Sequence, residues 1–427
     1  MNRREFIKTI STGAAGAIAL ASCGDNPTNS ITAKGKMTYR LNHSTGDQVS
    51  ILGFGMMRLP MMEDDTEAHQ QVIDQDQVNR LVDLAMKYGV NYYDTSPVYC
   101  QGKSEQATGE ALSRHPRNKY FVATKLSNFD PRTQTFEESV KMYHDSMEYL
   151  KVDYIDYYLL HSVGGRMEDF NRRFVDNGMM DYLLSERKEG RIRNLGFSFH
   201  GSKELFDEMM CLHEVYHWDF VQIQMNYFDW NNDPTTPYLY EQLKQRNISA
   251  VIMEPLLGGR LAKVPDSAMR EMKRREPDMS IASWAFRSCG TSRDVLTCLS
   301  GMTCIDHLED NVRTFSPLRA LTNEEIEFLD GVVHKMLANP EIPCTGCQYC
   351  MPCPYGIDIP GIFSYYNHHK DETGRFVKGY NAAIEAPRQA DHCIQCGICR
   401  RQCPQRINIP EQLAVIDKFV ENLKSKS

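Results

Sequence analysis

The chain has 427 residues, of which 41% are apolar, so it can form one large folded domain with an appendage and is not a disordered or fibrous protein. Its formal net charge of -8 argues against a nucleic-acid partner. Eight of the fourteen cysteines lie in two tight groups near the C-terminus, which predicts metal ligation and not disulfides. Four of the scattered cysteines are expected to be small core residues without a function: Cys211, Cys289, Cys298 and Cys304.

Residues 1–22 have the pattern of an export signal. Arg3 and Arg4 are followed by an apolar stretch that is too short to span a bilayer as a stable anchor. This run resembles a twin-arginine signal, and Leu20–Cys23 resembles a lipoprotein box, which implies cleavage before Cys23 and a lipid on its thiol. The protein is therefore expected on the periplasmic or cell-surface side, held to a membrane only by this lipid. The alternative is an ordinary N-terminal helix.

Residues 23–36 are rich in Asn, Thr, Ser and Gly, which predicts a flexible tether. From 37 to 320, short apolar runs alternate with amphipathic stretches such as Glu137–Leu150, Met180–Lys188 and Lys203–His213, a pattern typical of βα units around a parallel sheet. We therefore expect a (β/α)₈ barrel of the α/β class. Its eight strands are predicted at Ile51–Gly55, Val90–Asp94, Tyr120–Lys125, Tyr154–His161, Arg193–Ser198, Phe220–Gln224, Ser249–Met253 and Val295–Ser300.

Polar residues stand at the carboxyl ends of three predicted strands. These are Asp94, Lys125 and His161, and Tyr99 lies in the loop that follows Asp94. Barrels of this kind carry their chemistry on that rim. A single such residue is often structural, but four ionisable groups on one rim favour a catalytic site.

The chain from about 37 to 318 resembles the aldo-keto reductases. The resemblance rests on an ordered set of motifs: Asp94–Tyr99, Gly102–Glu105, Gly109–Leu112, Thr124–Lys125, Leu159–His161, Gly190–Arg193, Gly196–Ser198, Gln222 and Pro255–Gly259. It implies a small carbonyl or alcohol substrate. Tyr99 would protonate the carbonyl oxygen as hydride arrives, and Lys125 would strengthen that acid. Asp94 would hold the Lys125 ammonium, while His161 would donate a hydrogen bond to the carbonyl.

The resemblance also implies a nicotinamide dinucleotide, NAD(P)H, but not a preference for NADP. Cys304 replaces the lysine that the family uses on the adenosine phosphate, and Asp306 would repel a 2′-phosphate. Phe199 and Met253 replace an asparagine and an aromatic residue of the family's pattern. NAD and the absence of any soluble nicotinamide remain open. The expected cofactor-binding residues are Ser198, Gln222, Gly301 and Asn311.

Residues 321–427 are predicted to form a small, mainly helical, ferredoxin-like domain with two 4Fe-4S clusters. Two runs of Cys-x-x-Cys steps, each closed by Cys-Pro, have two-cluster ferredoxin spacing, and the fourth cysteine of each run ligates the other cluster. Zinc is the alternative, but it usually takes its ligands as two separated pairs. The final gap of the first group is one residue shorter than usual. Cluster 1 would use Cys344, Cys347, Cys350 and Cys403, and cluster 2 would use Cys393, Cys396, Cys399 and Cys353.

Helices are expected at Thr322–Leu337 and Glu411–Leu423, and Tyr365–Lys370 is interpreted as helix surface and not as a metal site. Carbonyl reduction takes two electrons and each cluster passes one, so the tail is expected to relay electrons, with a redox partner protein. The alternative function is an electron-transfer or ligand-binding lipoprotein whose barrel is inactive. The loops at 163–177 and 226–236 do not identify the substrate, although their aromatic residues are compatible with a sugar or with plain core.

Overall fold

The computed structural model describes residues 36–63, 71–338 and 340–425. The predicted export signal, Cys23 and nearly all of the predicted tether lie outside these residues. The described chain divides into two compact units. The first unit runs to Leu256 and continues over Asp266–Val333, and the second comprises Leu257–Pro265 and the chain from His334 onward.

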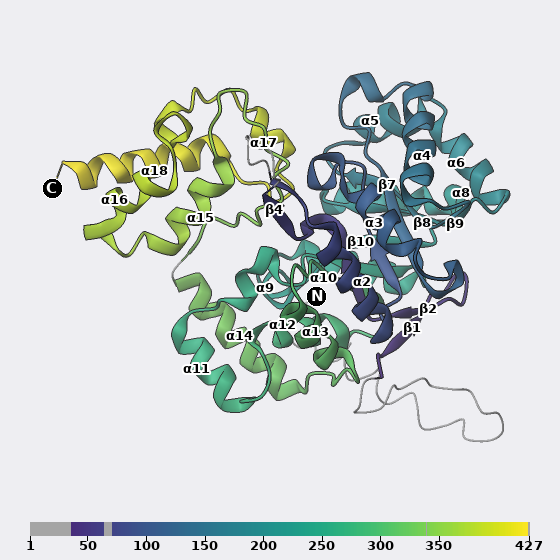
Figure 1. The fold of residues 1–427 in the computed structure, drawn as a ribbon, viewed down its shortest axis with the longest axis horizontal. Coiled ribbons are helices and arrows are strands. Elements are labelled where there is room, and N and C mark those ends of the chain that lie inside the picture. The colour runs from purple at the N-terminus through teal and green to yellow at the C-terminus, as the bar shows by residue number, and fades with distance from the viewer. Residues whose placement is uncertain (1–35, 64–70, 339, 426–427) are drawn as a thin grey trace. The chain divides into compact units, whose positions relative to one another are not determined.

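The first unit is a closed barrel of eight parallel strands, as the sequence predicted (Figure 1). All eight predicted strands are present, with boundaries that differ by at most two residues. Neighbouring strands in the barrel follow one another along the chain, so each is joined to the next by a crossover. The strands are β3 (Leu52–Gly55), β6 (Tyr92–Asp94), β7 (Phe121–Leu126), β8 (Ile155–Val163), β9 (Ile192–Phe199), β10 (Phe220–Gln224), β11 (Ser249–Met253) and β12 (Val295–Ser300).

Helices cover the outer face of the barrel because each carries an apolar stripe at helical spacing. In α2, for example, Val78, Leu81, Val82 and Ala85 are buried. The predicted helix at Lys203–His213 is divided in the structure into α7 and a short α8 (His213–Tyr216). The main covering helices are α2 (Gln75–Lys87), α3 (Ser104–Leu112), α4 (Phe136–Leu150), α6 (Met179–Lys188), α7 (Lys203–Cys211), α10 (Thr235–Gln245), α12 (Ile281–Thr291) and α13 (Ile305–Phe315).

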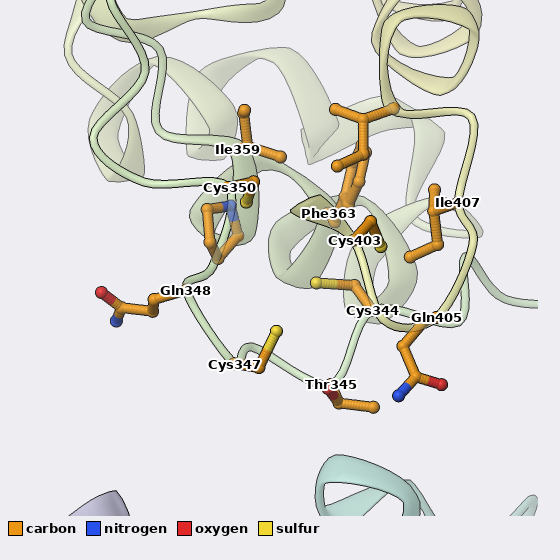
Figure 2. Close-up of a pocket in the computed structure, with 12 residues that line it drawn as sticks. Cys344, Thr345, Cys347, Gln348, Cys350, Ile359, Phe363, Cys403, Gln405 and Ile407 are labelled. Carbon is orange, nitrogen blue, oxygen red and sulfur yellow. The ribbon is translucent and has the colours of Figure 1, made fainter. Parts of the chain in front are cut away.

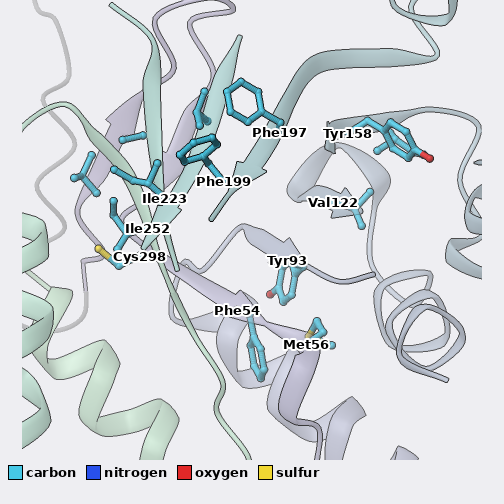
Figure 3. Packing of buried hydrophobic residues seen from close by; sticks show 14 of the residues in the cluster. Phe54, Met56, Tyr93, Val122, Tyr158, Phe197, Phe199, Ile223, Ile252 and Cys298 are labelled. Atoms are coloured by element: carbon cyan, nitrogen blue, oxygen red, sulfur yellow. The ribbon is translucent and has the colours of Figure 1, made fainter. Parts of the chain in front are cut away.

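The barrel has two apolar layers because successive side chains of a strand point to opposite faces. Tyr92 belongs to the inner layer that fills the barrel, and its neighbour Tyr93 belongs to the outer layer beneath the helices. Figure 3 shows outer-layer side chains from several strands, among them Val122 and Tyr158. Strands that are buried on both faces explain why the sequence shows apolar runs without alternation.

Two short hairpins were not predicted. β1 (Tyr39–Leu41) pairs antiparallel with β2 (Gln48–Ser50), and β4 (Met61–Glu63) pairs with β5 (Gln71–Ile73). The first hairpin lies against the amino end of the barrel, because Asn42 in its turn donates to the Tyr157 hydroxyl at 3.0 Å and to Asn194 Oδ1 at 2.9 Å. Three-residue strands are too short to show a clear sequence period.

The second unit is helical around its own apolar core, which contains Ile362, Phe363, Phe376, Leu413 and Ile416. The histidine-containing segment expected on a helix surface lies in α15. The predicted helix at Glu411–Leu423 is present in α18, and the one predicted at Thr322–Leu337 is present in α14, most of which belongs to the first unit. The elements are α14 (Asn323–Ala338), α15 (Ile359–His369), α16 (Thr373–Ala383), α17 (Ile398–Gln402) and α18 (Ile409–Lys424).

The scattered cysteines divide into buried and exposed ones. Cys289 and Cys298 are core residues as predicted, but the prediction is wrong for Cys211, which is exposed at the end of α7, and Cys304 is only partly buried. Both cysteines stand at helix ends, where a side chain can leave the packed face. Among the described residues, no helix is long and apolar enough to cross a membrane.

Candidate active site and cluster sites

The carboxyl ends of β6 and β7 bring Asp94 and Lys125 into contact. The two strands are neighbours in the barrel. Lys125 Nζ donates to Asp94 Oδ1 at 2.7 Å and to the Thr95 carbonyl oxygen at 2.7 Å. The Lys125 side chain is completely buried. This lysine is therefore a fixed charge inside the mouth of the barrel and not a mobile surface group.

Burial and pairing act in opposite directions on this ion pair. Burial lowers the pKa of Lys125, while the Asp94 carboxylate raises it again. Burial raises the pKa of Asp94, and Lys125 opposes that shift. A buried charge without a partner is strongly unfavourable, so each group depends on the other to stay ionised. Removing either would leave an uncompensated charge in the barrel.

Tyr99 lies beside this pair in the loop after β6. Its side chain is 7% exposed, and Lys125 Nζ lies 4.9 Å from the centroid of its ring. The His161 ring meets it edge-on, with 5.9 Å between the ring centroids. The loop is held in place because the Ser104 hydroxyl donates to the Met56 carbonyl oxygen at 2.7 Å. The structure thus gathers all four predicted catalytic residues at one point of the rim.

His161 is buried among hydroxyl groups and cations. Its Nδ1 lies 2.6 Å from Ser127 Oγ and 3.3 Å from Ser96 Oγ. Burial lowers the pKa of His161 well below its usual value, and the charges of Lys125 and Arg173 lower it further. The imidazole is therefore neutral at physiological pH, so it can donate one hydrogen bond without carrying a positive charge.

Sequence reasoning missed several residues around His161. Arg173 Nη2 donates to the His161 carbonyl oxygen at 2.7 Å, and its guanidinium lies 4.9 Å from the centroid of the Phe129 ring. Phe129 is 38% exposed, and its ring centroid is 5.0 Å from that of His161. The sequence does signal Ser127, which follows Lys125 by two positions as the strand period would require. Arg173 has no such signal, because it lies in residues 163–177, which were interpreted as a loop without a pattern. That interpretation is wrong for most of the stretch, since Met167–Phe170 and Asn171–Val175 are helical.

The four predicted cofactor-binding residues lie at the same end of the barrel. Gln222 and Ser198 are partners in register on β10 and β9, and both are buried. Ser198 Oγ accepts from the Ser162 backbone N–H at 2.7 Å. Gly301 directly follows β12, and Asn311 on α13 donates to Ser300 Oγ at 2.9 Å. They therefore come from β9, from β10, from the end of β12 and from the last covering helix.

The nicotinamide end of the dinucleotide that the resemblance implies would fit these residues. Gln222 Oε1 is buried and has no hydrogen-bond partner among the described residues, so it can accept from a carboxamide. The phosphate end is less favourable for NADP. Helix α13 begins with Cys304 as its N-cap, which makes no side-chain capping bond, and Asp306 lies in the first turn. A carboxylate at a helix N-terminus occupies the place that favours an anion, so it opposes a 2′-phosphate.

The first predicted cluster site is a cavity in the second unit. Figure 2 shows the four cysteines with their sulfur atoms turned toward the same space, although Cys403 comes from the other sequence group. Burial raises the pKa of Cys350 to about 12, and the other three thiols add to this shift. A bound metal would reverse it, because a coordinated thiol loses its proton. The predicted ligands among the lining residues are Cys344, Cys347, Cys350 and Cys403.

The second predicted set is also brought together. Burial raises the pKa of Cys399, and the neighbouring thiols of Cys393, Cys396 and Cys353 raise it further. Cys353 again comes from the other sequence group. No three His, Cys, Asp or Glu side chains of the described chain are arranged to hold a single metal ion. A body of four irons holds its thiolates around a larger volume than one ion does, so the cavity is the relevant observation for a cluster.

A loop from the barrel sequence belongs to the second unit and supports the first cysteine group. The loop lies within Leu257–Pro265 and has Gly258 at a φ of +67°. A Cβ on Gly258 would collide with the backbone of Thr345, which lies between Cys344 and Cys347. Arg260 Nε donates to Glu341 Oε2 at 2.9 Å. Only glycine therefore allows the two segments to approach so closely.

The model of the aldo/keto reductase family matches residues 51–334, which is more than half of the chain. The chain belongs to the aldo/keto reductase family. A 4Fe-4S dicluster domain matches residues 343–409 of the chain, a range that contains both cysteine groups. The protein is therefore an oxidoreductase with a C-terminal iron-sulfur domain, and this match favours clusters over zinc.

Known proteins similar to the reductase agree with this assignment. An uncharacterized oxidoreductase of Bacillus subtilis is 27% identical over 282 residues, covering 59% of this chain and 86% of that protein. L-galactose dehydrogenase of Arabidopsis thaliana is 26% identical over 316 residues, covering 67% and 90%. The solved structure of an aldo-keto reductase from Bacillus halodurans has a TM-score of 0.55 at 23% identity, covering 69% and 96%. At that identity the structural similarity shows the fold alone.

Proposed function

We propose that the protein reduces a carbonyl compound, or oxidises the matching alcohol, with Tyr99 as the proton donor or acceptor. The observation that supports this best is the position of the buried Lys125 ammonium, which is paired with Asp94 and lies 4.9 Å from the centroid of the Tyr99 ring. A cation at this place favours the phenolate that remains after proton donation. Neutral His161 would then orient the carbonyl through a hydrogen bond.

A bound nicotinamide dinucleotide would supply the hydride in this reaction. Ser198 and Gln222 would hold its nicotinamide end, while Gly301 and Asn311 would lie toward its phosphates. We propose NAD in preference to NADP, because Cys304 and Asp306 replace the basic surroundings that a 2′-phosphate requires.

The substrate is proposed to be cyclic and polar, with sugars as the first class to test. Phe129 offers a partly exposed aromatic ring beside His161, and such a ring can stack on an apolar sugar face. L-galactose dehydrogenase, one of the relatives, is named for a sugar substrate. Tyr227, in contrast, begins the short helix α9 (Tyr227–Asn232) in the stretch that was interpreted as a loop, and it is 2% exposed and packs as core.

The experiment that tests this function is an anaerobic titration with NADH and NADPH, followed by a screen of sugars and other carbonyl compounds. NADH is expected to quench tryptophan fluorescence at lower concentrations than NADPH. Asp306→Ser should bring the concentrations of NADH and NADPH that are needed for quenching closer together. Turnover of at least one carbonyl compound is expected with NADH. If neither nucleotide binds and no flavin copurifies, the hydride donor is missing, and the alternative of an electron-transfer protein with an inactive barrel is favoured.

We further propose that the two-cluster domain relays electrons between a redox partner protein and the barrel. Carbonyl reduction consumes two electrons and two protons, and two one-electron centres can hold that pair. This proposal is supported by the short distances within each cysteine set, since the thiols of each predicted set act on one another's pKa. Bleaching of the cluster absorbance by NADH in the titration above is expected. Full turnover with NADH in a variant that lacks both clusters would contradict a role for the relay in that reaction.

The last element of the proposal is export with a lipid on Cys23. It is supported by Arg3 and Arg4 in the leader and by the box Leu20–Cys23. Twin-arginine export carries folded proteins, which suits a chain whose clusters must be inserted first. Changing Arg3 and Arg4 to Lys is expected to leave the precursor in the cytoplasm, and Cys23→Ala should release the exported protein from the membrane. Fractionation and metabolic lipid labelling measure the two outcomes separately, and normal processing of either variant would contradict the corresponding half.

A further inference from the structure

The ring of His161 makes a short contact with two serine hydroxyls that no catalytic role accounts for. Ser127 Oγ lies 2.6 Å from Nδ1, Ser96 Oγ lies 3.3 Å from it, and the two hydroxyl oxygens are 2.9 Å apart. Both serines are buried, and they follow the ends of β6 and β7. The three groups form a closed network at one side of the imidazole.

The proton on the imidazole can be placed by counting donors and acceptors in this network. His161 is neutral, so one ring nitrogen carries a proton and the other accepts. If Nδ1 accepts from Ser127, then Ser127 Oγ can accept from Ser96, and both short contacts are hydrogen bonds in a single chain. If Nδ1 carried the proton, Ser127 Oγ would accept from it, and one of the two serine hydrogens would be poorly placed. Either Ser127 Oγ would also accept from Ser96, which leaves its own hydrogen with the Lys125 carbonyl oxygen at 3.4 Å, or Ser127 would donate to Ser96 Oγ, whose hydrogen would then have no acceptor among the described residues. The first arrangement satisfies the groups better.

The charges around the ring act in the same direction. Lys125, Arg173 and His200 all oppose a positive charge on His161. The acidic groups of this region are Asp94 and Glu105, which both act on Lys125, and Asp94 is bonded to it. The imidazole of His161 is therefore uncharged, and what the network determines is whether its proton is on Nδ1 or on Nε2.

The backbone of His161 is held as firmly as its ring. Arg173 donates to the carbonyl oxygens of His161 and Ser162 at 2.7 and 3.2 Å. Ser162 has a φ of +54°, and its N–H donates to Ser198 Oγ at 2.7 Å. A non-glycine residue adopts this conformation at a cost, which such contacts offset. The ring thus starts from a fixed backbone position.

We propose that Ser127, assisted by Ser96, is a positioning residue that holds His161 in the tautomer with its proton on Nε2. Nδ1 then accepts from the hydroxyl, and the single N–H of the ring is on Nε2. The catalytic consequence rests on the proposed function, but the tautomer itself does not.

The test is ¹⁵N NMR of the full chain labelled at histidine, with the His161 signals assigned by their loss in His161→Gln. The native protein is expected to show a protonated Nε2 and an accepting Nδ1 that do not change between about pH 6 and pH 8. In Ser127→Ala the Nδ1 signal should move and the two tautomers should mix, while Ser127→Thr, which keeps the hydroxyl, should restore the native pattern. A protonated Nδ1 in the native protein would overturn the proposal without need of any variant.

Activity provides a second readout once a carbonyl substrate is known. Ser127→Ala should lower kcat by roughly 2- to 10-fold, the range that corresponds to one neutral hydrogen bond, and leave the nucleotide KM unchanged. Ser50→Ala is the matched control, because it removes a buried hydroxyl at the opposite, amino end of the barrel and should leave both the NMR pattern and kcat unchanged. An unaltered tautomer in Ser127→Ala would overturn the role of Ser127. If the predicted tautomer were observed but no carbonyl compound were turned over, the proposed function would be refuted and the role of Ser127 in setting the tautomer would stand.

Discussion

Replacing Tyr99 by Phe is expected to lower kcat for carbonyl reduction by about 10²- to 10⁴-fold, the usual contribution of a positioned general acid. The variant loses the transferable proton but keeps the ring that packs beside Lys125 and His161. Because the ring stays, substrate and nucleotide KM should change little. Steady-state kinetics with a substrate from the carbonyl screen measures both parameters.

Tyr92→Phe is the matched control for this experiment. Tyr92 is another buried tyrosine, on β6 and in the inner layer of the barrel, and its hydroxyl has no hydrogen-bond partner among the described residues. The same atom is therefore removed from the same kind of environment without touching the rim. Activity of Tyr92→Phe should stay close to that of the native protein. If Tyr99→Phe were as active as this control, the barrel would not use Tyr99 as its acid.

The barrel could be predicted because its strands carry a strong local signal. Apolar runs such as Phe220–Gln224 and Ser249–Met253 have the same bounds in the structure as in the prediction. The hairpins β1–β2 and β4–β5 were missed because their strands are three residues long and depend on contacts far away in the sequence, such as that of Asn42 with Tyr157. The prediction that Cys211 is a core residue was wrong for a similar reason, since the burial of a side chain at a helix end depends on which other elements pack against that end.

The site was predictable to the extent that it follows strand ends. Asp94, Lys125 and His161 stand where consecutive parallel strands end, so the topology alone places them on one rim. Phe129 comes from the loop after β7 and Arg173 from the helical segment Asn171–Val175, and nothing in their sequence pattern shows that they fold back onto His161. The two cysteine sets were predicted from their spacing, including the exchange of Cys353 and Cys403, and the structure brings each set together.

The second prediction concerns the exchange of the fourth cysteines, Cys353 and Cys403, between the two clusters. The protein purified anaerobically is expected to contain about eight irons per chain, and Cys403→Ser should reduce this to about four. The reason is that Cys403 lines the cavity of the first group together with Cys347, so its loss should spoil cluster 1 and spare cluster 2. Iron analysis gives the number, and electron paramagnetic resonance of the reduced protein shows which cluster remains. Cys298→Ser, at a buried cysteine of the barrel, should keep all of the iron.

The comparison that decides the pairing is between three variants. If the fourth cysteines are exchanged, the spectrum of Cys403→Ser should match that of Cys347→Ser and differ from that of Cys396→Ser. If each sequence group instead held its own cluster, Cys403→Ser would match Cys396→Ser, because both would then belong to cluster 2. Cys353→Ser gives the reciprocal result, since its thiol raises the pKa of Cys399 and so lies within the second set. Exchange makes each cluster depend on both sequence groups, so neither cluster can have all four of its ligands until the chain between Cys353 and Cys393 has folded.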